Sequence, residues 1–280
     1  MLNFLLSPEG RWESGARAEL HQNRGFLFGD GFFETIRQCS DGLIPLASFH
    51  AGRISRSAAQ LGFSGFTHFS EAGLLRLISG IPAPPFRGDR RLKLVFFRQG
   101  PGAYAPETSC TAGIYAEVSE LAQPFISRIS NLGISEKVQL FPSAWAGIKS
   151  LSALPYVLAA RERREMGADE ILLLSPDGLV VEGSFSAVFW KDSLGIRFAE
   201  ESLGGVDSCM RRFLRHHFQA EKISCNPARI EARTLFETAG WILCASALGL
   251  RFFSQEKDFR LPEEFSQLAG LGFSGWELPT

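Results

Sequence analysis

The residue with the most distinctive chemistry in the sequence is Lys149, a single basic residue in the small-residue, apolar segment WAGIKSLSALPYVL. Its nearest charged neighbours along the chain are Lys137 and Arg161. Most lysines are solvated surface residues, and that interpretation stays open for Lys149. Partial burial among apolar groups lowers the pKa of an amine, and the neutral amine can attack an aldehyde to form a Schiff base. Lys149 is therefore a candidate nucleophile.

A second candidate is Glu182, which ends the apolar run of VVEGSFSAVFW and precedes Gly183 and two serines. An ordinary interpretation is a carboxylate that meets water at the end of a strand. The functional interpretation is a carboxylate that keeps the pyridine nitrogen of pyridoxal 5'-phosphate protonated. That proton makes the cofactor's ring an electron sink.

Two further features are suited to binding a phosphate group. Arg53, in HAGRISRSA, falls on an expected helix with Arg56 three residues later. It fits either a solvated basic face or a bidentate phosphate contact. The segment GGVDSCMRR leads through a glycine pair to Ser208, a good N-cap for a following helix. The amides of a helix N-terminus bind phosphate, although many capped helices bind nothing. Ser246, in CASALGL, is a further candidate, although serines are common in turns.

The elements that must position these residues follow from periodicity and from turn residues. Strands are expected at GFFETIRQ, RRLKLVFFRQG and TAGIYAEVSEL, and a turn leading into a strand at residues 43–45. Helices are expected at FHAGRISRSAAQLGF, ending at Gly62, and at EAGLLRLISGI. KVQLFPSAW is expected to be extended, and residues 152–166 to form a helix with Leu151, Leu154, Val157 and Leu158 on one face. ADEILLLSPDGLVVEGSFSAVFW predicts three short strands, SCMRRFLRHHF an amphipathic helix, and GWILCASALGL a buried strand entering a turn.

These elements indicate an α+β (α/β) protein of two domains. The proline in ELAQPF marks the best linker. We expect a small N-terminal domain over residues 1–120, a linker over 121–127, and a larger C-terminal domain over 128–280 that carries Lys149 and the phosphate site.

The composition excludes several classes of function. The chain has 280 residues, of which 45% are hydrophobic and 21% charged, an ordinary globular balance. A formal net charge of −1 offers no basic surface for a nucleic acid, and the longest apolar run, 240–250, is too short for a membrane span. The five cysteines have no metal-ligand spacing, so no metal is expected. Their odd number and the lack of a signal peptide predict a reducing, cytoplasmic setting.

Four segments, in sequence order, resemble the class IV aminotransferases, the fold-type IV family of pyridoxal phosphate enzymes. They are GFLFGDGFFETIR, FHAGRISRSAAQLG, the long stretch from GIKSLSALPYVL to SAVFW, and GGVDSCMRRFL. The long stretch is the most specific of the four. The resemblance covers about residues 25–250. It implies two domains with the cofactor in the cleft between them, and a homodimer.

The resemblance also implies a role for each candidate. Lys149 matches the lysine that forms the Schiff base with the cofactor and transfers protons, and Glu182 matches the partner of the pyridine nitrogen. Arg53 matches a phosphate ligand. The amides of Cys209 and Met210, which follow Ser208, match the phosphate-binding helix start, with Ser246 nearby.

The family contains 4-amino-4-deoxychorismate lyases, branched-chain aminotransferases and D-amino acid aminotransferases. GVDSCMRR resembles the lyase turn more than the GIT turn common in transaminases, and RQGPGAYAPE resembles the lyase loop. We therefore expect a lyase that forms p-aminobenzoate and pyruvate for folate, with a branched-chain or D-amino acid aminotransferase as the alternative. Arg98 and Tyr104 are the candidates for substrate binding, although Tyr104 could equally be a packed loop tyrosine. A non-catalytic protein on this scaffold would be expected to lack Lys149 or Glu182, and both are present.

Overall fold

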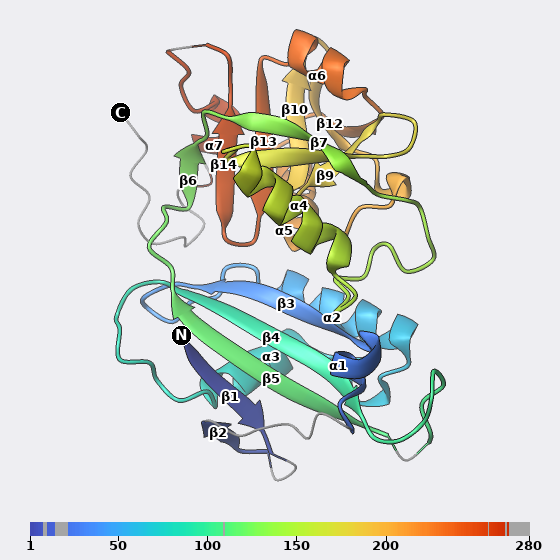
Figure 1. The fold of residues 1–280 in the computed structure, drawn as a ribbon. Helices are drawn as coiled ribbons and strands as arrows, with labels where there is room; N and C mark the ends of the chain where they lie inside the picture. Colours follow the sequence, from blue (N-terminus) through green and yellow to red (C-terminus); the bar gives the residue numbers. More distant parts are fainter. Residues whose placement is uncertain (8–9, 15–21, 109, 257, 267, 269–280) are drawn as a thin grey trace. The chain divides into compact units, whose positions relative to one another are not determined.

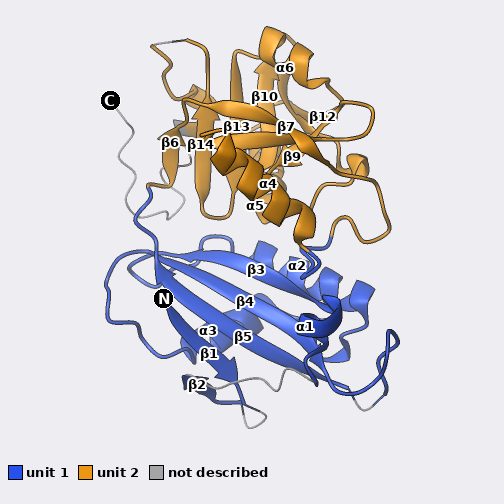
Figure 2. Cartoon of the chain, in the orientation of Figure 1, with its two compact units in different colours: residues 1–123, 148–152 blue, residues 124–147, 153–280 orange. Residues whose placement is uncertain are grey.

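The computed structural model describes residues 1–7, 10–14, 22–108, 110–256, 258–266 and 268 (Figure 1). The chain divides into two compact units (Figure 2). Unit 1 comprises Met1–Gln123 and Ile148–Ser152, and unit 2 comprises Pro124–Gly147 and Ala153–Thr280. The division at Gln123 falls inside the stretch expected to be a linker. Lys149, however, lies in unit 1, whereas the sequence predicted it on the C-terminal domain.

Unit 1 is built on a five-stranded antiparallel sheet in the order β2-β1-β5-β4-β3. Its strands are β1 (Leu2–Leu6), β2 (Trp12–Ser14), β3 (Gly31–Gln38), β4 (Arg90–Gln99) and β5 (Thr111–Glu120). The helices are α1 (Arg24–Phe28), α2 (Ala47–Leu61) and α3 (Glu71–Ser79), with a 3-10 turn η2 (Ser64–Phe66). The strands expected in the sequence at 31–38, 90–100 and 111–121 correspond to β3, β4 and β5.

Helices α2 and α3 cover one face of this sheet, and apolar side chains fill the space between them (Figure 1). Phe32 and Ile36 of β3 are fully buried there, because alternate residues of a strand point to the same face. Ile54 of α2 is likewise fully buried, and α2 ends at Leu61 and is capped by Gly62, whose φ of 70° fits the left-handed helix cap that glycine favours. Both predicted helices of unit 1 are therefore confirmed, while residues 43–45 form no strand.

The segment 148–152 extends the edge of the unit 1 sheet. The amide of Phe33 donates to the carbonyl of Lys149 at 2.9 Å, and the amide of Leu151 donates to the carbonyl of Gly31 at 3.0 Å. Between these two bonds, Ser150 lies opposite Phe32 in an antiparallel bridge. Lys149 is thus held by backbone pairing with β3.

Unit 2 contains two sheets. The larger has six strands in the order β12-β11-β10-β13-β14-β6, and the smaller has three in the order β7-β8-β9. The strands are β6 (Ile126–Arg128), β7 (Leu132–Gln139), β8 (Glu170–Leu174), β9 (Val180–Gly183), β10 (Ala187–Asp192), β11 (Gly195–Ala199), β12 (Cys225–Ala228), β13 (Trp241–Ser246) and β14 (Gly249–Phe253). The helices are α4 (Leu154–Glu165), α5 (Cys209–Ala220), α6 (Ala232–Thr238) and α7 (Glu263–Ser266), with a 3-10 turn η3 (Glu201–Leu203).

A buried apolar cluster joins the two sheets of unit 2. Leu172 and Val180 from the smaller sheet pack with Trp190 and Ile242 from the larger one. The three strands predicted between residues 168 and 190 are β8, β9 and β10, and the predicted SPDG hairpin connects β8 to β9, with Gly178 at a φ of 76°.

Helix α4 differs from its prediction in two respects. It begins at Leu154 instead of residue 152, since Pro155 suits the first turn of a helix and residues 148–152 pair with β3. Its apolar stripe, Leu154, Val157 and Leu158, is 65%, 61% and 47% exposed, and the helix instead buries Ala159 and Glu162. Among the described residues, no helix has the length and hydropathy needed to cross a membrane.

Candidate functional site

The amine of Lys149 lies against an aromatic ring of unit 1. Its Nζ is 4.6 Å from the centroid of the Phe33 ring, and the residue is half-buried. The turn that precedes β3 has to pass close to this segment. Gly29 has a φ of 67°, and a Cβ there would lie 2.3 Å from Oγ of Ser152. The structure therefore fixes the backbone of Lys149 while leaving its amine against an aromatic surface.

Arg53 belongs to a buried charged cluster on α2 and β3. Its Nε donates to Oε1 of Glu34 at 2.7 Å and its Nη2 donates to Oε2 at 2.6 Å, while Nδ1 of His50 lies 2.7 Å from Oε2. Burial raises the pKa of Glu34, but the charge of Arg53 and hydrogen bonds from Arg53 and His50 outweigh it and lower that pKa to about 2. Glu34 thus orients the guanidinium that the sequence proposed as a phosphate ligand.

Glu182 ends β9 in unit 2 and is only 4% exposed. The hydroxyl of Tyr156, from α4, donates to its Oε1 at 2.5 Å. The backbone amide of Val206 donates to its Oε2 at 3.0 Å. The carboxylate therefore lies in the interior of the chain, with a hydrogen-bond donor at each oxygen, and is not the water-exposed strand end of the ordinary interpretation.

The start of α5 has the form that the sequence predicted. Ser208 is the N-cap, and its hydroxyl accepts a hydrogen bond from the amide of Arg211 at 3.2 Å. Cys209 and Met210 form the first turn of this 12-residue helix and are both 1% exposed. The amides of a helix's first turn point out of the helix end, where they can donate to a phosphate.

Ser246 ends β13 in unit 2, and its hydroxyl takes part in the following turn. It accepts from the amide of Leu248 at 3.3 Å and donates to the carbonyl of Gly249 at 3.4 Å. Phosphate binding by Ser246 would have to compete with these two contacts.

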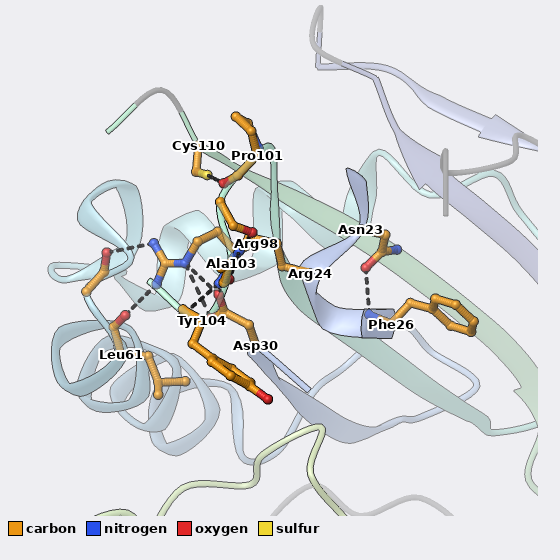
Figure 3. Close-up of polar contacts among 12 residues, drawn as sticks. Asn23, Arg24, Phe26, Asp30, Leu61, Arg98, Pro101, Ala103, Tyr104 and Cys110 are labelled. Carbon is orange, nitrogen blue, oxygen red and sulfur yellow. Dashed lines mark hydrogen bonds and ion pairs between the residues drawn. The ribbon is translucent and has the colours of Figure 1, made fainter. Parts of the chain in front are cut away.

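The two substrate candidates have opposite surroundings in unit 1 (Figure 3). The guanidinium of Arg98 donates to Asp30 at 3.1 Å and to the carbonyls of Leu61 at 2.5 Å and Gly62 at 3.3 Å. It also lies 4.4 Å from the centroid of the Phe63 ring. A substrate carboxylate would have to displace these partners, so the contacts of Arg98 are structural ones.

Tyr104, by contrast, is 90% exposed, on the loop of residues 100–105. Arg24, which is 1% exposed, holds the backbone of this loop (Figure 3). Its Nη1 donates to the carbonyls of Gly102 and Ala103 at 2.8 and 2.7 Å, and its Nη2 donates to that of Tyr104 at 2.8 Å. The Tyr104 ring pairs with Phe28 at 5.7 Å between centroids. Tyr104 is therefore an exposed side chain on a fixed backbone.

The predicted site residues divide between the two units. Unit 1 holds Lys149, Arg53, Arg98 and Tyr104, and unit 2 holds Glu182, Ser208, Cys209, Met210 and Ser246. In unit 1, Lys149 and Arg53 contact neighbouring residues of one strand, Phe33 and Glu34. In unit 2, Val206 links the Glu182 carboxylate to the turn that leads into α5.

The sequence interpretation missed several polar residues at these candidates: Glu34, Arg24 and Tyr156 contact them, and His50 contacts Glu34. Glu34 had a detectable signal, because it shares the apolar strand face of Phe32 and Ile36, where a charge needs a partner. Tyr156 had no comparable signal, since a tyrosine in a helix is ordinary.

The sequence matches the model of one protein family, described as amino-transferase class IV, over residues 31–255. The D-alanine aminotransferase of Bacillus licheniformis is 30% identical over 171 residues. That match spans 60% of this chain and 58% of the relative's length.

Solved structures share the fold at lower sequence identity. The 4-amino-4-deoxychorismate lyase of Pseudomonas aeruginosa superposes with a TM-score of 0.71 at 22% identity, covering 91% of this chain and 92% of that one. The branched-chain aminotransferase of Thermoproteus uzoniensis, solved with norvaline, gives 0.76 at 19% identity, covering 90% and 86%. An aminotransferase from Brucella abortus, bound to its cofactor PLP, gives 0.78 at 16% identity, covering 97% and 98%.

The family match extends over most of the chain, and the fold-type IV architecture recurs in these structures. The chain belongs to the class IV aminotransferases, a family of enzymes that use pyridoxal phosphate.

Proposed function

We propose that this chain is a pyridoxal phosphate-dependent lyase that converts 4-amino-4-deoxychorismate into p-aminobenzoate and pyruvate. The proposal combines the family membership with the chemistry of the residues described above and with the lyase-like segments GVDSCMRR and RQGPGAYAPE.

The donor set of this chain fits the cofactor. Lys149 offers a half-buried amine beside Phe33, and Glu182 offers a buried carboxylate whose position is fixed by two donors. The first-turn amides of α5 and the guanidinium of Arg53 are both suited to a phosphate group. We propose that Lys149 holds the cofactor covalently, that Glu182 partners its ring nitrogen, and that Arg53, Cys209 and Met210 bind its phosphate, with Ser208 shaping the helix start and Ser246 nearby.

The residues of the chain would then act on the substrate as follows. When bound, pyridoxal phosphate supplies an electron sink for the carbon that bears the substrate's amino group. The Nζ of Lys149, as a free amine, would take the proton from this carbon. The electron pair left by that proton would form a double bond to the adjacent ring carbon and break its C–O bond, so that the enolpyruvyl group leaves as the enolate of pyruvate and gains a proton. The remaining ring becomes aromatic p-aminobenzoate, so the reaction is strongly downhill.

The observation that favours the lyase is the loop of residues 100–105. Its sequence, GPGAYA, contains no cationic side chain, and the guanidinium of Arg98 just before it is engaged by Asp30 and two carbonyls. This loop therefore offers no cation to either candidate substrate, because 4-amino-4-deoxychorismate carries carboxylates as an amino acid does, and the preference for the lyase rests on the aromatic side chains. Tyr104 and Phe28 instead present an aromatic pair that suits a six-membered ring. We therefore keep Tyr104 as the substrate-contacting candidate and give Arg98 a structural role.

A transaminase is the second candidate, and one observation favours it. The relative with 30% identity is a D-alanine aminotransferase. A transaminase would use Lys149 and Glu182 in the same way but would return the proton to the cofactor and pass the amino group to a keto acid. As this alternative, we propose an aminotransferase that acts on a branched-chain or a D-amino acid.

We also propose that the chain forms a homodimer. The family resemblance suggests this assembly, and α4 has an apolar face, Leu154, Val157 and Leu158, that its own unit leaves exposed. We propose that a second copy of the chain packs against this face.

The test of the lyase is an assay of purified, cofactor-loaded protein with 4-amino-4-deoxychorismate and no keto acid. We expect p-aminobenzoate, measured by fluorescence, and pyruvate, measured with a coupled enzyme, in equal amounts. Protein that shows the visible absorption of bound cofactor but forms neither product would overturn the lyase. Turnover of D-alanine or a branched-chain amino acid with 2-oxoglutarate would then establish the transaminase.

The lysine assignment has a matched control in the same unit. Lys93 also lies over the Phe33 ring, with Nζ 5.2 Å from the centroid. Lys149→Ala is expected to abolish turnover and the visible absorption of bound cofactor, whereas Lys93→Ala keeps both. Wild-type activity in Lys149→Ala would refute the assignment.

A further inference from the structure

Tyr156 makes a buried hydrogen bond that the proposed roles do not account for. It lies on α4, far along the chain from β9, yet its hydroxyl is 2.5 Å from Oε1 of Glu182. The amide of Val206 approaches the other carboxylate oxygen at 3.0 Å. Two donors from separate segments therefore fix both the position and the plane of one carboxylate.

A carboxylate that is this deeply buried needs donors to remain charged. Removing an ionised carboxyl from water costs several kcal/mol unless hydrogen bonds or opposite charges compensate. Burial, the charge of Glu182 and the hydrogen bond to it all raise the pKa of the Tyr156 phenol, so the hydroxyl keeps its proton and acts as the donor. The direction of this bond is thus set: Tyr156 donates and Glu182 accepts.

Other charged groups surround this pair in unit 2. Arg211 of α5 is 3% exposed, lies close enough for its charge to interact with that of Glu182, and donates from Nη2 to the carbonyl of Val206 at 3.2 Å. Glu170 of β8 accepts a hydrogen bond at 2.8 Å from the hydroxyl of Ser186, in the turn after Gly183, and it is paired with Arg251 at 2.5 Å. Arg211 acts on Glu182 through its charge, whereas Tyr156 acts through a neutral hydroxyl that donates a direct hydrogen bond to the carboxylate.

We propose that Tyr156 is a positioning residue for Glu182, which holds the carboxylate in place and in its charged form as the partner of the cofactor's ring nitrogen. The inference rests on the proposed role of Glu182, and it adds a residue that neither the motif nor the helix pattern indicated. An ionised, fixed carboxylate keeps the ring nitrogen protonated, and so this one hydroxyl on α4 sets how strongly the cofactor withdraws electrons.

The test is Tyr156→Phe, which removes the hydroxyl and keeps the ring. The loss of one hydrogen bond to a charged group is expected to lower kcat by about tenfold or more, with KM changed by less than about twofold. We also expect the midpoint of the pH titration of the bound cofactor's visible absorption to shift. The matched control is Tyr115→Phe, which removes the hydroxyl that donates to Asn3 at 2.8 Å in unit 1 and should change none of these quantities.

A double-mutant cycle with Glu182→Gln separates a positioning role from a structural one. If Tyr156 acts through the Glu182 charge, Tyr156→Phe changes kcat and the spectrum much less in the Glu182→Gln background than in the wild type. An equal effect in both backgrounds, or no effect in the wild type, would overturn the proposal. If Tyr156→Phe does not fold, the cycle uses Tyr156→His, whose ring N–H can still donate a hydrogen bond. The kcat of Tyr156→His should then lie between those of the wild type and Glu182→Gln.

Failure of this inference differs from failure of the proposed function. Wild-type protein that binds the cofactor and forms product, while Tyr156→Phe behaves identically, removes only the role of Tyr156. Wild-type protein that shows no visible absorption after loading with pyridoxal phosphate overturns both.

Discussion

At the scale of single residues, the buried carboxylate of Glu34 determines what Arg53 can do. Both oxygens of Glu34 face Arg53, and His50 shares one of them. This arrangement holds the guanidinium in one orientation, as a phosphate contact would require. It also means that removing Arg53 leaves a buried carboxylate without its main partner, which is strongly destabilising. Arg53→Lys, which keeps a positive charge, is therefore a better probe of phosphate binding than Arg53→Ala.

The lowered pKa of Glu34 predicts how stability depends on pH. The group titrates at about 2 in the folded chain against 4.5 for the free side chain. Its contribution to the free energy of unfolding, about 3 kcal/mol from this difference, is therefore fully present above pH 4.5 and is lost as the pH falls toward 2. We expect Glu34→Gln to lower the free energy of unfolding at pH 7 and to show a smaller further loss at pH 3.

Urea unfolding at pH 7 and pH 3 measures this effect. The control is Glu165→Gln, which breaks exposed ion pairs with Lys137 and Arg161 and should change stability little. An acid-induced loss as steep in Glu34→Gln as in the wild type would contradict the role given to Glu34.

The residue scale also marks a limit of sequence reasoning. Glu34 could have been found, because strand alternation places it among Phe32 and Ile36. The role of Arg24 in holding the loop could not, because the three acceptors there are backbone carbonyls 78 to 80 residues away. Backbone acceptors carry no sequence signature, and only the fold brings them to the guanidinium.

At the scale of elements, Arg24 predicts how the loop of residues 100–105 behaves. Because one buried guanidinium binds three successive carbonyls of this loop, Arg24→Ala should release the loop and expose its backbone to proteases. We expect chymotrypsin to cleave native Arg24→Ala after Tyr104 about tenfold faster than the wild type or more, as for the loss of a charged hydrogen bond.

Arg98→Lys provides the matched comparison. Arg98 shares Asp30 with Arg24, but its other two bonds go to Leu61 and Gly62, outside the loop. Cleavage after Tyr104 should therefore stay close to the wild-type rate. Equal acceleration in both variants would mean that Asp30, not the contacts of Arg24 with the loop, controls its order.

The elements themselves were largely accessible from the sequence. Alternation identified β3, β4 and β5, and helical spacing together with Gly62 identified α2 and its end. The α4 region was less accessible, because its apolar residues Leu154, Val157 and Leu158 face away from the core of their own unit. Helical spacing of apolar residues looks the same in the sequence whether those residues pack in a core or against a partner.

At the scale of the whole molecule, the proposed homodimer predicts the mass in solution and a loss of dimer stability when a charge is placed on α4. Light scattering should give twice the 30.9 kDa of the chain. A charge in the exposed face of α4 would be buried against the second copy, so Leu158→Glu should weaken the dimer by at least about tenfold. Leu194→Glu, on the exposed turn between β10 and β11, is the control and should leave the mass unchanged. A wild-type chain that stays monomeric at micromolar concentration would refute the assembly.

The path of the chain through residues 148–152 also bears on how the protein is made. The chain leaves unit 1 after Gln123, returns for Ile148–Ser152, and leaves again. During synthesis this short segment is made only after residues 124–147 of unit 2. The edge of β3 therefore stays unpaired until residues 148–152 have been synthesised. A fragment ending at Gln123 would lack both the acceptor for the Phe33 amide and Lys149 itself. The two units are therefore not separable modules, and the gene cannot be divided at the linker without losing the residue on which the proposed chemistry depends.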